Sequence, residues 1–104
     1  LHNGQAEGRQ VIPAGWCQDI RHGAHGLYDP ENYKKWPKGA YRNQFWVEDS
    51  ELGRHYCFGV FGQMVMVAPD SGMMVVKLSS WPDFVNSDTF RRTMAGLRAV
   101  EAAR

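Results

Sequence analysis

The sequence predicts an α+β fold in which a three-stranded antiparallel meander carries a C-terminal helix packed on it. Apolar stretches flank residues 68–72, where proline, aspartate and glycine occur in an order suited to a hairpin turn. Asn86 or Ser87 can cap a helix that follows. The apolar side chains of this helix have three-to-four spacing and predict one amphipathic stripe: Phe90, Met94, Leu97 and Val100. The chain therefore forms one segment, divided into a short helix and loop (1–40), antiparallel strands (41–80) and a C-terminal helix (87–103).

The first forty residues predict little regular structure. Residues 1–4 have the pattern of a last helical turn with a glycine C-cap, which favours a protein that extends upstream. Pro13 suits the first position of a helix that runs to about Arg21, because its missing N–H costs nothing there. Residues 22–40 are rich in glycine, proline and aromatic side chains and predict a loop, either a lid or a structural cover.

The strands are predicted at residues 41–47, 55–67 and 73–80. Within the last two, residues 64–67 and 73–76 are apolar at every position, whereas a half-exposed strand should alternate. Continuous apolar strands are typically buried on both faces. Because the chain has few helices to cover two faces, we expect further cover from an upstream segment or from a partner copy in a homo-oligomer.

Composition and missing motifs exclude several functions. The chain has 104 residues, 43% hydrophobic and 22% charged, with a formal net charge of +1. We therefore expect a globular segment that binds no nucleic acid, and the lack of a long apolar run predicts no membrane span. No serine has a lysine three residues later, and no glycine-rich cofactor or phosphate motif occurs. We expect no cofactor and no nucleophilic serine in this chain.

The histidines and cysteines permit a metal site but do not favour one. His22 and His25 have a tolerable ligand spacing, and His55 shares a predicted strand face with Cys57. The two pairs would have to meet, so we expect surface or loop histidines and no metal. Cys17 and Cys57 form either one disulfide or two free buried thiols. We favour free thiols, because free cysteine behaves as a small hydrophobe, and the compartment stays open with the cytoplasm slightly favoured.

Two short segments carry residues suited to acyl transfer. Tyr41-Arg42-Asn43 matches a Tyr-x-Asn pattern that supplies a base in some hydrolases, but its position favours a structural strand start. Gly59 and Gly62 interrupt a strand, which glycine weakens. Close approach of a ligand would explain them, since a bare backbone N–H stabilises a developing oxyanion. A bulge or a close helix crossing explains them equally well.

A family resemblance rests on residues 3–16, 41–46, 59–63 and 75–83. The string from Lys77 to Asp83, Lys-Leu-Ser-Ser-Trp-Pro-Asp, is the most specific part. Together these segments resemble the C-terminal portion of class C β-lactamase-like, penicillin-binding serine hydrolases, and among them the 6-aminohexanoate-dimer hydrolase group. The resemblance implies that a serine, activated by a lysine and a tyrosine, attacks a carbonyl and forms an acyl-enzyme. These three side chains lie upstream of this chain in that family.

The resemblance also implies which residues here contribute to such a site. The backbone N–H of Val60, just after Gly59, matches the oxyanion-hole donor of the family. A shifted register would instead make Gly62 and Gln63 the pair. The residues implied in substrate binding are Trp46, Phe61, Gly62 and Gln63.

Two departures from the family pattern bear on the substrate. Cys57-Phe58-Gly59 stands where penicillin-binding relatives have Lys-Thr-Gly, so the cation that grips a β-lactam carboxylate is absent and amides or esters are favoured. Phe61 stands where a histidine is common and makes the site more apolar. The resulting prediction is a hydrolase fragment for small-molecule amides or esters, inactive alone. The alternative is a non-catalytic binding or oligomerisation module on the same scaffold.

Overall fold

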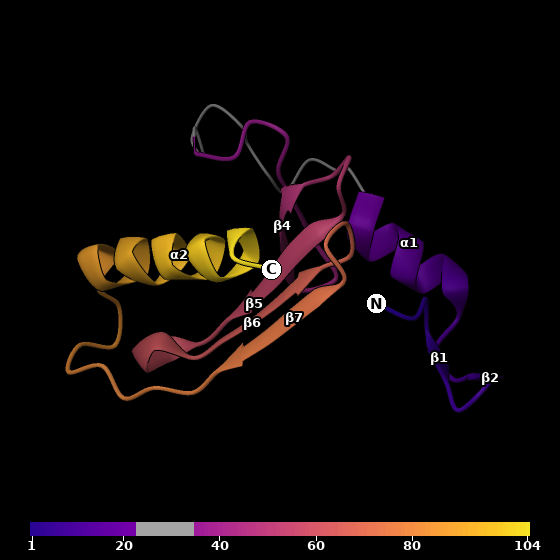
Figure 1. Ribbon diagram of the computed structural model, residues 1–104, viewed down its shortest axis with the longest axis horizontal. Helices are drawn as coiled ribbons and strands as arrows, with labels where there is room; N and C mark the ends of the chain where they lie inside the picture. Colours follow the sequence, from indigo (N-terminus) through magenta and orange to yellow (C-terminus); the bar gives the residue numbers. More distant parts are fainter. Residues whose placement is uncertain (23–34) are drawn as a thin grey trace.

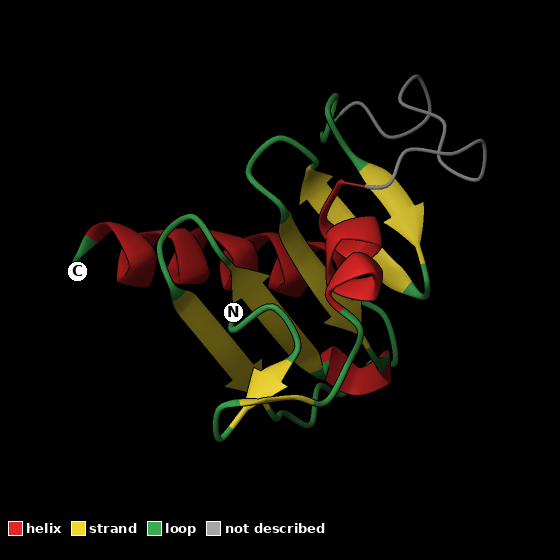
Figure 2. Ribbon diagram, turned by 90° about the vertical axis from the view of Figure 1, so that its right-hand side faces the viewer, coloured by secondary structure: helices red, strands yellow, loops and turns green. Residues whose placement is uncertain are grey.

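The computed structural model describes residues 1–22 and 35–104. Most of the loop predicted at 22–40, including His25, lies outside these residues. The structure has three layers, with α2 and α1 on opposite faces of a sheet (Figures 1 and 2). In chain order the elements are β1 (Gln5–Ala6), β2 (Arg9–Gln10), α1 (Ala14–His22), β3 (Ala40–Arg42), β4 (Phe45–Asp49), β5 (Arg54–Phe58), the 3₁₀ turn η1 (Val60–Gly62), β6 (Met64–Ala68), β7 (Met73–Lys77) and α2 (Ser87–Ala102).

The sheet confirms the α+β class but has five strands where the sequence predicted three. Its order is β3-β4-β5-β6-β7, an antiparallel meander. Two predicted strands are each a hairpin. Residues 41–47 reverse at Asn43 and Gln44, which both have positive φ (51° and 66°), as a type I′ turn requires. Asparagine tolerates this conformation, and Asp19 accepts a hydrogen bond from its side chain at 2.8 Å.

The second correction concerns residues 55–67, predicted as one strand. The chain leaves β5 at Phe58, turns through η1 and returns as β6, with Phe58 opposite Met64. The two glycines that seemed to interrupt a strand therefore flank and end a tight turn. Gly62 has a φ of +83°, a left-handed conformation that glycine adopts without strain.

Helix α2 packs on the face of the sheet that holds the main core. Asn86 caps it, with its Oδ1 accepting from the Thr89 N–H at 2.9 Å. Of the predicted stripe, Phe90, Met94 and Leu97 face the core, whereas Val100 is exposed. The buried core cluster consists of Tyr56, Met64, Met66, Ala68, Met73, Met94 and Leu97.

Ion pairs and hydrogen bonds tie α2 to the strands. Arg98 pairs with Glu48 at 2.8 Å, and Glu48 also accepts from the buried Tyr56 hydroxyl at 2.5 Å. Arg54 reaches Glu101 at 2.9 Å from β5. Because these contacts span β4, β5 and α2, they set the angle at which the helix crosses the sheet.

The opposite face of the sheet is only partly covered. Helix α1 lies over β4 and β5, where Val47 and His55 are buried (Figure 2). Beyond it, Met74 and Val76 of β7 are 54% and 58% exposed, and Leu78 is 83% exposed. Strand β7 therefore keeps one bare side in the described residues, whereas Val65 and Val67 of β6 are half-buried on that face. The bare side of β7 is in line with the shortage of cover expected from the sequence.

Several N-terminal predictions change. Residues 1–4 form a turn that leads into the β1-β2 hairpin, and no helical turn ends there, because Asn3 and Gly4 are both left-handed. The predicted helix after Pro13 is present as α1. Cys17 and Cys57 are both free and half-buried. Within the described residues, neither α1 nor α2 has the length and apolar character that a bilayer crossing demands.

Candidate functional site

The turn between β5 and β6 forms the centre of the candidate site. Gly59 has extended backbone (φ −114°, ψ 167°) and leads into Val60, which is 50% exposed. Phe61 then adopts a left-handed conformation (φ 55°, ψ 25°), which a side chain with a β-carbon disfavours. Such strain persists only where surrounding structure imposes it, and it occurs often at functional sites.

The backbone N–H groups of this turn differ in what they bind. Gly59 donates to the carbonyl of Gln63 at 2.9 Å, Phe61 donates to that of Phe84 at 2.9 Å, and Gln63 donates to that of Val60 at 3.4 Å. Within residues 1–22 and 35–104, the Val60 N–H has no acceptor. The Gly62 N–H lies inside the 3₁₀ turn η1 and is used by its i→i+3 hydrogen bond. The turn therefore offers the donor that the sequence predicted, the N–H of Val60.

The turn is braced by the segment that links β7 to α2. The Gly62 carbonyl accepts from Lys77 Nζ at 2.9 Å and from Ser79 Oγ at 2.6 Å. The Phe61 carbonyl accepts from the Trp81 N–H at 3.2 Å. Sequence reasoning assigned no role to Lys77, Ser79 or Trp81, although all three lie in the most specific stretch of the family resemblance.

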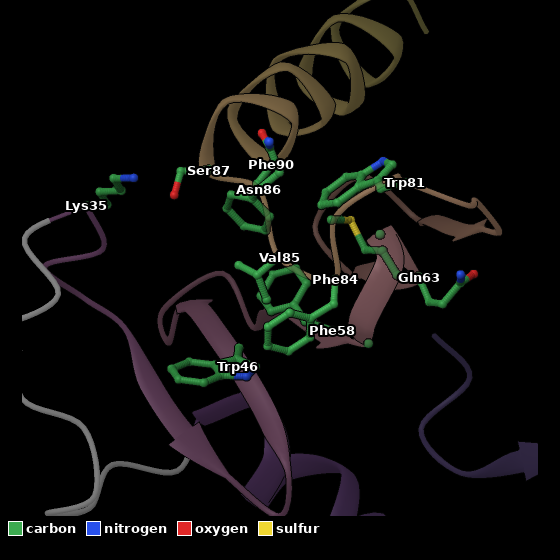
Figure 3. Close-up of a pocket in the computed structure, with 13 residues that line it drawn as sticks. Lys35, Trp46, Phe58, Gln63, Trp81, Phe84, Val85, Asn86, Ser87 and Phe90 are labelled. Carbon is green, nitrogen blue, oxygen red and sulfur yellow. The ribbon is translucent and has the colours of Figure 1, made fainter.

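An open cavity of about 310 Å³ lies beside the turn, under the start of α2 (Figure 3). This volume is at the lower end of the range for small-molecule sites. Trp46, Gly62 and Gln63, which the resemblance implied in substrate binding, line it together with Gly59, whereas Val60 and Phe61 do not. The Gln63 side chain points away from the aromatic rings and binds Ser79 instead.

Most of the cavity wall is aromatic and was not predicted. Phe58 lies edge-on to Phe90 with ring centroids 5.2 Å apart, and Phe84 lines the same cavity (Figure 3). Lys35, at the rim, is the only charged side chain among the described lining residues. The wall therefore suits an apolar group more than an anion. Phe90 belonged to the predicted apolar stripe of α2, but only the fold shows that its side chain lines a cavity.

Other candidate residues have structural partners. The ring of Tyr41 packs at a tilt against that of Trp46, with centroids 4.7 Å apart. Asn43 lies in the hairpin turn, which agrees with the interpretation of this segment as a strand start. Burial and the carboxylate of Glu48 raise the pKa of Tyr56, so its hydroxyl stays protonated and donates.

Two of the histidines that suggested a metal site bind backbone carbonyls, and His25 lies outside the described residues. His22 contacts the Ser50 carbonyl at 2.6 Å, and the Nδ1–H of buried His55 donates to the Gly53 carbonyl at 2.7 Å. Burial raises the pKa of the Cys57 thiol, which disfavours the thiolate that a metal binds. In the described part of the chain, no three potential ligands converge.

Comparison with known proteins gives an informative similarity to a hydrolase. No protein-family model matches the chain. The chain is 33% identical over 85 residues to a 6-aminohexanoate-dimer hydrolase of Paenarthrobacter ureafaciens. The match covers 80% of this chain and 22% of that protein, so the chain spans about a fifth of its relative's length. This similarity supports the resemblance to β-lactamase-like hydrolases at the level of a distant, partial relative.

Proposed function

We propose that this chain is the C-terminal portion of a serine hydrolase that cleaves small-molecule amides or esters through an acyl-enzyme. Its chemical contribution is the N–H of Val60, which donates to the oxyanion that forms when the serine attacks the carbonyl. The serine, lysine and tyrosine come from another part of the complete protein. The chain alone is inactive and needs no cofactor.

One observation carries the assignment to Val60. Its N–H is unpaired in the described residues, while the neighbouring donors of Gly59 and Phe61 are paired. The alternative pair is less suited, because the Gln63 N–H already donates to the Val60 carbonyl. Gly59 and Gly62, on either side of the donor in the sequence, line the cavity, although Val60 itself does not. This supports a substrate position close to the turn.

The similarity to a 6-aminohexanoate-dimer hydrolase supports the class of reaction. The name of that relative describes hydrolysis of a 6-aminohexanoate dimer. In this chain, the aromatic wall of Phe58, Phe84 and Phe90 offers an apolar cleft. We therefore propose substrates whose group beside the scissile carbonyl is apolar.

The test is Val60→Pro in the complete protein. Proline removes the N–H, and the extended backbone of Gly59 is the conformation that a residue before proline adopts. Because the N–H binds nothing in the described residues, its loss costs the free protein no hydrogen bond. We expect kcat for a p-nitrophenyl ester to fall about 100- to 1,000-fold, the usual effect of losing one oxyanion donor.

Val60→Ala is the matched control, because it trims the side chain and keeps the N–H. It should retain kcat, and both variants should unfold at the temperature of the unmodified protein. Turnover by Val60→Pro equal to that of Val60→Ala would exclude Val60 as the donor. If the complete protein formed no acyl-enzyme with ester or amide substrates, the proposal of a serine hydrolase would be wrong.

The second candidate is a non-catalytic module that binds or oligomerises through its sheet. The exposed row of Met74, Val76 and Leu78 favours it, since a water-exposed apolar strand face predicts association. The two candidates differ in what covers this face: an upstream segment of the same protein, or a second copy of the chain. A concentration-dependent dimer that Val76→Asp dissociates, without hydrolysis by the complete protein, would favour the module.

A further inference from the structure

Lys77, the last residue of β7, directs its side chain at the turn of residues 59–63. Its Nζ lies 2.9 Å from the Gly62 carbonyl and 2.6 Å from Ser79 Oγ, and 4.8 Å from the centre of the Trp81 ring. An ammonium that meets a carbonyl, a hydroxyl and a ring face is restricted to one orientation. The half-buried lysine therefore joins three groups around the candidate oxyanion donor.

Ser79 and Gln63 extend this contact into a clamp. The Ser79 hydroxyl has one proton, which goes to the Gly62 carbonyl at 2.6 Å while the oxygen accepts from Lys77. The Gln63 carboxamide binds both backbone groups of Ser79: its Oε1 accepts from the N–H at 3.1 Å, and its Nε2 donates to the carbonyl. The Gln63 side chain therefore supplies to Ser79 the hydrogen bonds that a neighbouring strand would supply if β7 continued.

The segment between β7 and α2 also holds Phe61, the strained residue of the turn. The Phe61 N–H donates to the Phe84 carbonyl at 2.9 Å, and the Phe61 carbonyl accepts from the Trp81 N–H at 3.2 Å. On the other side of Val60, the Gly59 N–H is bound to the Gln63 carbonyl. The peptide that carries the Val60 N–H is therefore fixed at both ends, although that N–H has no acceptor in the described residues.

We propose that Lys77 is a positioning residue for the Val60 N–H. It acts through the Gly62 carbonyl, Ser79 and Trp81, and it touches neither substrate nor oxyanion. The inference rests on the proposed function, since it assumes that the Val60 N–H is the donor. Without the ammonium, the Gly62 carbonyl loses its charged partner and the left-handed Phe61 relaxes, so the N–H points in a wider range of directions. An oxyanion forms only in the transition state, so the cost falls on kcat rather than on KM.

The experiment compares Lys77→Met with Lys77→Arg in the complete protein. Methionine keeps an unbranched side chain over Trp81 but removes the donors, whereas arginine keeps a cation with several donors. We expect Lys77→Met to lower kcat for a p-nitrophenyl ester about 10- to 100-fold, the scale of a misplaced catalytic group, with KM unchanged. Lys77→Arg should recover most of the loss. Ser79→Ala should lower kcat in the same way, and it provides the measurement if Lys77→Met does not fold.

Lys38→Met is the control for loss of a lysine charge, because Lys38 is exposed and pairs with Glu51 away from the turn. Its kcat should equal that of the unmodified protein. Lys77→Met and Ser79→Ala with full kcat, beside an inactive Val60→Pro, would overturn the positioning role and leave the proposed function intact. An active Val60→Pro would overturn both, since no donor would remain to position.

Discussion

The α-carbon of Gly62 lies against the indole of Trp81, with no room for a side chain between them. A β-carbon on Gly62 would sit 2.5 Å from Trp81 Cδ2 and 2.6 Å from Ser79 Oγ. Real β-carbons do not approach other atoms so closely, and the Trp81 ring is already held over Lys77. The close approach fixes the distance between the turn and the linker to α2.

This contact predicts that Gly62→Ala costs far more than another left-handed glycine. Gly72 has a φ of +67° and open space around it, so Gly72→Ala should cost only the conformational penalty, about 1–2 kcal/mol. Gly62→Ala should cost about 1–3 kcal/mol more, because it also overpacks the linker. Urea unfolding of both variants measures the difference. Equal losses would mean that Trp81 moves aside freely.

The N-cap of α2 predicts a second effect on stability. Asn86→Ala removes the acceptor of the Thr89 N–H and should lower the free energy of unfolding by about 1 kcal/mol. Asn86→Asp should keep the cap and add a favourable charge at the helix N-terminus. Thermal unfolding of the two variants compares them directly. A loss of the same size in Asn86→Asp would show that the amide serves another purpose, such as its bond to Asp83.

His55 predicts a loss of stability in acid. Burial holds the pKa of His55 below its ordinary value of 6.5, and the charge of Arg21 adds to this. Between the two values the unfolded chain binds more protons, so stability present above pH 6.5 is lost as the pH falls through the folded pKa. His55→Asn, whose amide nitrogen can replace Nδ1, should lack this dependence. Melting temperatures between pH 7.5 and 5 test it, and parallel curves for both proteins would contradict the assignment.

Met66 and Met74 lie on opposite faces of the sheet. Comparing their substitution by alanine tests whether the face that carries Met74 is covered in the complete protein. Met66 is 2% exposed, so Met66→Ala should cost about 2–5 kcal/mol in any context. Met74 is 54% exposed in this chain, where Met74→Ala should cost less than about 0.5 kcal/mol. In the complete protein we expect Met74→Ala to cost over about 1 kcal/mol, because an upstream segment buries it. A negligible cost there, by urea unfolding, would mean that the face remains in water.

Local patterns were sufficient for several elements. The turn at 68–72, the α2 helix with a cap at Asn86 or Ser87, and the strands that are apolar at every position all follow from side chains close together in sequence. The structure selects Asn86 as the cap. Turn chemistry, capping and burial periodicity act over a few residues, so one sequence reveals them. The resemblance carried by Lys77 to Asp83 also needed no structure.

The sequence by itself determined the α+β class, the apolar strands and the helix that covers one of their faces. Only the tertiary structure decided that residues 43–44 and 60–62 reverse the chain. Left-handed turns at non-glycine residues depend on distant partners, Asp19 for Asn43 and Phe84 for Phe61. The conformational propensities of neighbouring residues therefore do not predict these turns. For the same reason, the unpaired Val60 N–H and its brace became visible only once the linker to α2 was placed against the turn.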